Sequence, residues 1–83
     1  MGRLVKLWKS QETDESVEYR YGPDRDSTGR LVITKSTGIV TLPEPVPGMS
    51  PQESWFLYGM LAKAKAEKMR REDDYTDEAS MAT

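Results

Sequence analysis

The chain has 83 residues, 36% hydrophobic and 31% charged, which suits one small domain with a small apolar core. It contains neither cysteine nor histidine, which excludes disulfides, thiolate or imidazole metal sites and the commonest nucleophile–base pairs of enzymes. Twelve basic and fourteen acidic residues give a net charge of -2, and adjacent blocks of opposite sign argue against long-range attraction of a polyanion.

No apolar run approaches the roughly 18 residues of a membrane span. The segment from Met1 to Lys9 carries positive charge but lacks the continuous apolar region of a signal peptide. We therefore expect a cytoplasmic protein with no membrane partner.

Two apolar patterns near the start of the chain are typical of β-strands. Residues 4–8 form a short apolar run, and further on Val17, Tyr19 and Tyr21 alternate with polar residues. Strict alternation indicates a strand with one buried and one solvated face. The first run leaves its inward face open, because Leu4 and Trp8 compete for burial with Val5 and Leu7.

Residues 24–29 resemble the first half of an EF-hand calcium loop. Its ligand positions 1, 3 and 5 and its glycine position 6 are filled by Asp24, Asp26, Thr28 and Gly29. Position 12 requires a bidentate glutamate, whereas this chain has Lys35 there. We therefore predict a polar hairpin loop in which aspartate side chains bond turn amides and Gly29 supplies a positive φ. No metal or cofactor is expected.

Residues 31–35 and 39–42 also have strand character, and Ser36-Thr37-Gly38 separates them. They could be a hairpin or one long strand bent at Gly38. In either case the sequence predicts an antiparallel meander of three or four strands within residues 3–42.

The second half of the chain predicts a connector, a helix and a tail. Alternating prolines make residues 43–49 an extended connector. Ser50-Pro51-Gln52-Glu53 is a capping box with proline at the first helical position, so a helix should run over residues 50–72. The acidic segment 73–83 offers few residues to bury and is predicted to be disordered. The expected fold is a single α+β domain, residues 1–72, with one C-terminal helix packed on the sheet.

Projection of the helix at 100° per residue gives two apolar stripes. The inward stripe contains Trp55, Tyr58, Ala62, Ala66 and Met69, with Leu61 at its border. The predicted core therefore combines this stripe with the strands, as Val5, Leu7, Val17, Tyr19, Tyr21, Leu31, Ile33, Trp55, Tyr58, Leu61 and Ala62. The second stripe, which the sheet cannot cover, contains Phe56, Met60 and Ala64, with Leu57 beside it.

These patterns favour a small non-catalytic interaction module that self-associates or binds a protein partner through the helix. Its predicted interaction residues are Phe56, Leu57, Met60 and Ala64. The alternative is a nucleic-acid-binding module that uses the basic first strand and the basic helix end, with contacts from Arg3, Lys6, Lys9, Lys68 and Arg71. No enzyme activity is expected, because no set of carboxylates, hydroxyls or lysines has the spacing of a catalytic motif. No small-molecule substrate is indicated.

Overall fold

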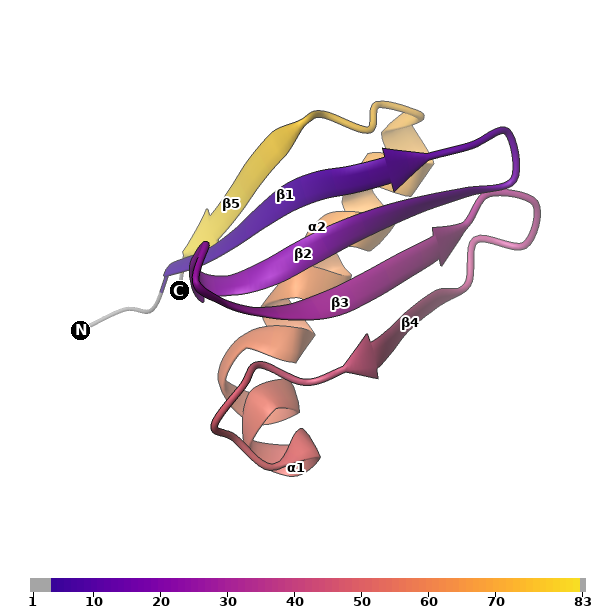
Figure 1. Ribbon diagram of the computed structural model, residues 1–83. Coiled ribbons are helices and arrows are strands. Elements are labelled where there is room, and N and C mark those ends of the chain that lie inside the picture. Colours follow the sequence, from indigo (N-terminus) through magenta and orange to yellow (C-terminus); the bar gives the residue numbers. More distant parts are fainter. Residues whose placement is uncertain (1–3, 83) are drawn as a thin grey trace.

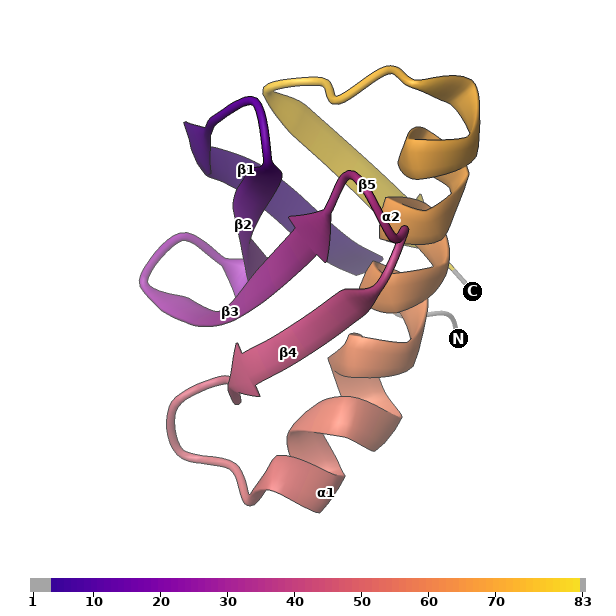
Figure 2. The ribbon, with the colours of Figure 1, turned by 90° about the vertical axis from the view of Figure 1, so that its right-hand side faces the viewer.

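The computed structural model describes residues 4–82 and shows a five-stranded sheet covered on one face by a helical layer (Figures 1 and 2). The sheet is antiparallel throughout, with strand order β4-β3-β2-β1-β5. The elements in chain order are β1 (Leu4–Glu12), β2 (Ser16–Asp24), β3 (Ser27–Thr34), β4 (Val40–Glu44), α1 (Pro51–Ser54), η1 (Trp55–Gly59), α2 (Met60–Glu72) and β5 (Glu78–Ala82). The α+β class and the meander are as predicted.

The inner face of the sheet confirms most of the predicted core. Each strand places every second side chain under the helix, as the period of two requires. The first strand turns Val5 and Leu7 inward, which leaves Leu4 46% exposed and Trp8 on the open face. The predicted core residues that are buried are Val5, Leu7, Val17, Tyr19, Tyr21, Leu31, Ile33 and Ala62.

The segment between residues 31 and 42 is a hairpin rather than one bent strand. β3 and β4 pair in antiparallel orientation, and residues 35–39 form the turn between them. Gly38 has a φ of +75°, a conformation that side chains with a Cβ rarely adopt. The Gly38 amide donates to the Thr34 carbonyl at 2.8 Å, which closes the turn.

The loop between β2 and β3 is the predicted polar turn, although Gly29 has a different role. The Asp24 carboxylate accepts hydrogen bonds from the Asp26 amide at 2.9 Å and the Ser27 amide at 3.0 Å. Gly29 lies within β3 and is not among the glycines with positive φ. A Cβ on Gly29 would lie 2.9 Å from the Tyr21 ring, so the position requires glycine because of close packing.

The strand count corrects the prediction, since the segment expected to be a disordered tail contributes β5. The helix ends at Asp73, whose φ of 51° reverses the chain, and the Asp74 amide donates to the Met69 carbonyl at 3.0 Å. The chain then returns along β1, and the Tyr19 hydroxyl donates to the Thr76 carbonyl at 2.7 Å. Ala79 packs against the core. Composition alone underestimated this segment, because a few inward side chains are enough for an edge strand.

The helix begins where the capping signal places it. The Glu53 amide donates to the Ser50 hydroxyl at 3.2 Å, and Pro51 occupies the first turn. The connector is shorter than predicted, because Pro43 and Glu44 belong to β4. Val46 is only 1% exposed, and its amide donates to the Ser54 hydroxyl at 2.8 Å, so the connector completes the core beneath the helix.

A π-helical turn, η1, overturns part of the predicted helix face. The buried positions at the start of the helix, Ser54 and Gly59, are five residues apart, which is the π spacing. The wider turn changes which of its residues face the sheet, and Trp55, at its start, is 40% exposed. Tyr58 and Leu61 are only partly buried against the core. The prediction that these three residues belong to the core is therefore wrong for Trp55 and too strong for the other two.

Candidate functional sites

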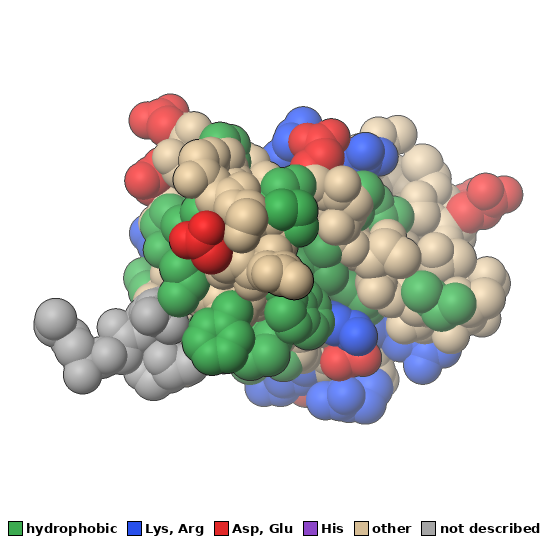
Figure 3. Space-filling view, turned by 90° about the horizontal axis from the view of Figure 1, so that it is seen from below, with side chains coloured by type: hydrophobic (Ala, Val, Ile, Leu, Met, Phe, Trp, Pro, Cys, Tyr) green, Lys and Arg blue, Asp and Glu red, His purple; other side chains and the backbone are tan. Residues whose placement is uncertain are grey.

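The helix presents an apolar surface on the side that faces away from the sheet. Phe56 is 69% exposed and Met60 is 46% exposed, and Ala64 follows them one turn further along. These three residues define the helix surface, and the fourth predicted interaction residue, Leu57, lies beside it partly buried. Figure 3 looks onto the α1 end of the molecule and shows hydrophobic side chains gathered there, with lysine and arginine to one side.

Charged residues flank the helix surface with opposite signs at its two ends. Glu53 lies exposed in the first turn of the helix. The last turns carry exposed Lys68, Arg70 and Arg71 beside exposed Glu67 and Glu72, so the cations outnumber the carboxylates there. Trp55 lies at the lateral border, where the Lys63 ammonium is 5.8 Å from its ring centroid. The helix surface therefore has an apolar centre, an acidic end and a basic end.

The other outward surface is the open face of the sheet, which the helix leaves uncovered (Figure 2). The strand register places one residue from each strand in a row across this face. In strand order from β5 to β4, the row is Glu78, Trp8, Arg20, Arg30 and Glu44. An aromatic ring and two guanidinium groups thus lie between two carboxylates.

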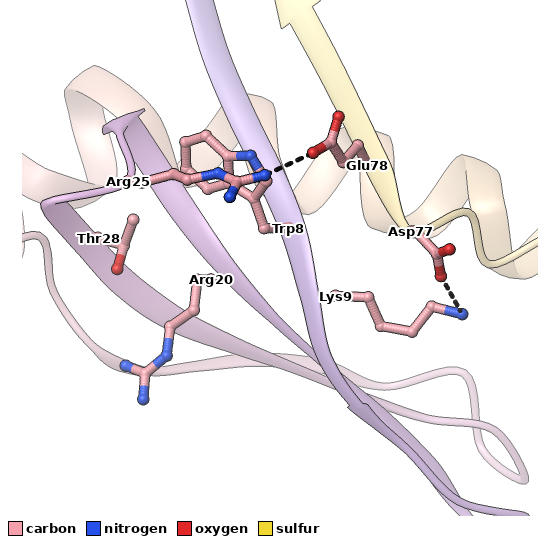
Figure 4. Close-up of a pocket in the computed structure, with 7 residues that line it drawn as sticks. All are labelled: Trp8, Lys9, Arg20, Arg25, Thr28, Asp77 and Glu78. Atoms are coloured by element: carbon pink, nitrogen blue, oxygen red, sulfur yellow. Dashed lines mark hydrogen bonds and ion pairs between the residues drawn. The ribbon is translucent and has the colours of Figure 1, made fainter.

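A hollow of about 410 Å3 opens beside Trp8. Arg25, from the turn between β2 and β3, lies over the Trp8 ring at 5.6 Å from its centroid (Figure 4). Arg25 also forms an ion pair of 2.7 Å with Glu78 on β5. Arg20 and Thr28 line the hollow across from this pair. A second hollow of about 220 Å3 lies between Trp8, Lys6 and β5, so the ring borders two depressions.

Ion pairs at the far end of β1 engage one of the predicted nucleic-acid contacts. The Lys9 ammonium lies 2.8 Å from the Glu12 carboxylate and 3.3 Å from that of Asp77. Hydrogen bonds from Lys9 and Lys35 lower the pKa of Glu12 to about 2, and the Glu12 carboxylate in turn raises the pKa of Lys9. The charge of Lys9 is therefore already balanced within the protein.

Further ion pairs cross the open face of the sheet. Arg30 contacts Glu18 at 2.6 Å and Glu44 at 3.6 Å. The Arg30 hydrogen bond, followed by one from Ser10, lowers the pKa of Glu18. Arg20 has a longer ion pair, 3.7 Å to Glu44. Of the three arginines on this face, Arg20 has the longest distance to its nearest carboxylate, so its charge is the least compensated within the protein.

The predicted nucleic-acid contacts do not form one surface. Lys6 lies on the open face of the sheet, because it alternates with buried Val5 and Leu7. Lys68 and Arg71 are exposed on the helix, which covers the opposite face. Arg3 lies outside the described residues.

The sequence analysis did not predict the arginines of the open face as site residues, although part of the signal was present. The alternation of Val17, Tyr19 and Tyr21 already assigns Arg20 to the solvated face of its strand. The position of Arg25 over Trp8 could not be read in this way, because it depends on the turn that carries Arg25 back across the sheet.

Comparison with known proteins gives no relative for this arrangement. No protein-family model, no curated protein and no solved structure matches the chain. Within residues 4–82, no group of three or more acidic side chains could hold a metal ion, and no helix has the length and hydropathy of a membrane span.

Proposed function

We propose that the protein is a small non-catalytic interaction module that pairs with a second copy of itself through the helix surface. The observation that carries this proposal is the exposure of Phe56 and Met60, 69% and 46%, on the side of the helix that faces away from the sheet. The connector does not cover them, because Val46 is buried in the core instead. Burial of a large apolar side chain contributes about 1.5–3 kcal/mol, and a twofold dimer would bury four of them.

The charges at the two ends of the helix favour antiparallel pairing. In a parallel pair, Glu53 would face the partner's Glu53, and Arg71 would face Arg71. In an antiparallel pair whose twofold axis crosses the helices between Met60 and Ala64, Glu53 lies opposite the basic end of the other copy. The same register packs Met60 against the small side chain of Ala64. Apolar centre and charged rim are the usual organisation of a protein interface.

Sedimentation velocity across the micromolar range tests this proposal. The unmodified protein should change from monomer to dimer as its concentration rises, whereas a Phe56→Glu/Met60→Glu variant should remain a folded monomer. Ile39→Glu is the matched control, because Ile39 is also exposed, at 58%, but lies in the turn between β3 and β4. An unmodified protein that stays monomeric at high micromolar concentration would contradict the proposal.

A charge reversal tests the orientation. Arg71→Glu should weaken the dimer, and the double variant Glu53→Arg/Arg71→Glu should restore it, because the opposite charges are exchanged across the interface. Equal weakening in the single and double variants would exclude the antiparallel register. Circular dichroism controls for folding, since Glu53 also takes part in the helix cap.

A further inference from the structure

We infer that Trp8, Arg20 and Arg25 form a binding site for a nucleotide unit, with the base against the Trp8 ring and the phosphate on the arginines. This site lies on the open face of the sheet and does not depend on the helix surface. It also differs from the nucleic-acid surface predicted from the sequence, because it uses neither Lys68 nor Arg71.

The first argument is the placement of Trp8. Trp8 lies on β1, which pairs with β2 and β5, so the ring stands on the open face of an interior strand beside two hollows. The larger hollow, of about 410 Å3, falls in the range of about 300–1,000 Å3 that small-molecule sites occupy. The smaller hollow brings Lys6 to the other side of the same ring. Single-stranded nucleic-acid sites combine such aromatic rings with cations along the backbone path.

The second argument is that the Trp8 ring already holds a planar cation that can leave. The Arg25 guanidinium covers the ring, and among residues 4–82 its ion-pair partner is Glu78, at 2.7 Å. Both side chains of this ion pair are largely exposed, 71% and 65%, and exposed pairs of this kind contribute little to stability. Arg25 can therefore swing away from the ring, admit a base and bond its phosphate.

The third argument is the charge of the row. Arg20 and Arg30 lie directly opposite one another on β2 and β3, an arrangement that is unfavourable for like charges. Glu18 compensates Arg30 at 2.6 Å, and Glu44, on the exposed edge strand, lies 3.7 Å from Arg20 and 3.6 Å from Arg30. Within the described residues Arg20 therefore has only this longer, shared ion pair, which leaves its guanidinium able to bond an anion. Arginine suits the role because its planar donors match phosphate oxygens.

The hollow also contains two carboxylates, and their pairing decides whether an anion can enter. Asp77 pairs with Lys9 at 3.3 Å, and Glu78 pairs with Arg25. The lining therefore holds three cations and two anions, which leaves a net charge of +1 next to Arg20. Because this excess is small, we expect weak binding that depends strongly on salt.

Fluorescence titration of a Trp55→Phe protein tests the site, since Trp8 is then the single tryptophan. Short single-stranded DNA and RNA oligonucleotides should quench Trp8 at low salt. Binding should weaken as salt rises, in proportion to the number of phosphates contacted. A mononucleotide is titrated in parallel: equal affinity would identify a site for free nucleotides, and much tighter oligonucleotide binding would identify a strand path.

Variants separate stacking from charge. In fluorescence anisotropy with a labelled oligonucleotide, Trp8→Ala should weaken binding at least about fivefold, as the loss of one stacked base does, and Trp8→Phe should retain part of it. Arg20→Gln should weaken binding and lower the salt slope by about 0.7. Lys68→Gln and Arg71→Gln, on the helix, are the controls; at protein concentrations where the unmodified protein and both variants sediment as monomers, they should bind as the unmodified protein does.

Three results would overturn the inference. They are no oligonucleotide binding at low salt, equal binding of polyglutamate, which carries charge without bases, and unchanged binding by a folded Trp8→Ala variant. A loss of binding in the helix variants would instead assign the nucleic-acid surface to the helix end. None of these results depends on whether the protein dimerises, so the two proposals fail separately.

Discussion

The molecule consists of two regions that are built in different ways and carry one outward surface each. Residues 4–44 are sequential hairpins, in which every strand pairs with the one before it in the chain. Residues 45–82 cover those hairpins through long-range contacts and return β5 to the far side of β1. The open sheet face belongs mainly to the hairpin region, whereas the helix surface belongs to the covering region.

This difference separates the two surfaces in chemistry. On the open sheet face, the aromatic ring of Trp8 is partly buried beneath a guanidinium group and is surrounded by ion pairs. On the helix surface, the aromatic ring of Phe56 is 69% exposed among apolar side chains. Association through Trp8 should therefore respond strongly to salt, and association through Phe56 should respond weakly, because desolvation of apolar area is less sensitive to ionic strength.

Removal of residues 74–83 should have the largest effect. This truncation deletes β5, the carbonyl of Thr76 that accepts from Tyr19, and the packing of Tyr75 against the core. Several kcal/mol of stability should be lost, which corresponds to a fall of at least about 10 °C in Tm for a domain of this size. Thermal denaturation followed by circular dichroism measures it. An unchanged Tm would show that the hairpin region is stable without its edge strand.

Ser54→Ala should have the next largest effect, because Ser54 joins the two regions. Its hydroxyl accepts from the Val46 amide at 2.8 Å and lies 3.3 Å from the Tyr21 hydroxyl, and the residue is only 1% exposed. Its removal leaves a buried amide without a partner, which should cost about 1–3 kcal/mol.

Urea denaturation provides the measurement for Ser54→Ala. The matched control is Ser80→Ala on the exposed side of β5, which should change stability by less than about 0.5 kcal/mol. Equal midpoints for the two variants would mean that the contact between connector, helix and Tyr21 adds no stability.

The two regions also differ in how far their structure can be predicted from sequence. In the hairpin region, alternation of Val17, Tyr19 and Tyr21 is a local signal, and it places the buried and open faces correctly. In the covering region, the local cap at Ser50 fixes the start of the helix. The π turn was not predictable from a 100° projection, because that projection assumes α-helical spacing throughout. Gly59, at the end of the turn, lies close to Leu42 of β4, a contact across the layers that the sequence does not show.

The remaining failures have similar causes. β5 pairs with β1, at the other end of the chain, and it lies in the acidic segment 73–83, whose composition resembles that of a disordered tail. By contrast, the helix projection did predict that Phe56 and Met60 lie on a face that the sheet does not cover, and both are exposed in the structure. The open-face site was missed, because the distance of Arg25 from Trp8 is a property of the folded turn.

Gly59→Val tests whether the π turn positions the covering region. A Cβ at Gly59 would lie 2.9 Å from the Trp55 ring and 3.1 Å from the Leu42 side chain, so helix and sheet would have to separate. Overpacking of this kind should cost about 1–3 kcal/mol. Ala64→Val on the exposed side of the helix is the control, and at protein concentrations where the chain is monomeric it should cost less than about 1 kcal/mol, from helix propensity alone. A similar loss in both variants would remove the packing explanation for η1.

Acid titration of stability should show the smallest effect, and it concerns the hairpin region. The pKa of Glu12 falls from 4.5 to about 2 because Lys9 and Lys35 donate hydrogen bonds to its carboxylate. A carboxyl whose folded pKa is depressed stabilises the fold above its unfolded pKa, and this contribution disappears as the pH falls through the folded value. Glu12 is therefore expected to contribute fully above about pH 4.5 and to lose its contribution progressively towards pH 2.

Urea midpoints measured across this range should fall less steeply for Glu12→Gln than for the unmodified protein. Glu15→Gln, in the exposed turn that follows β1, is the control and should preserve the steeper slope. Because Glu12 lies at the surface, the difference should be small and should shrink with added salt. Identical slopes in the Glu12 variant and the unmodified protein would show that these ion pairs do not persist in solution.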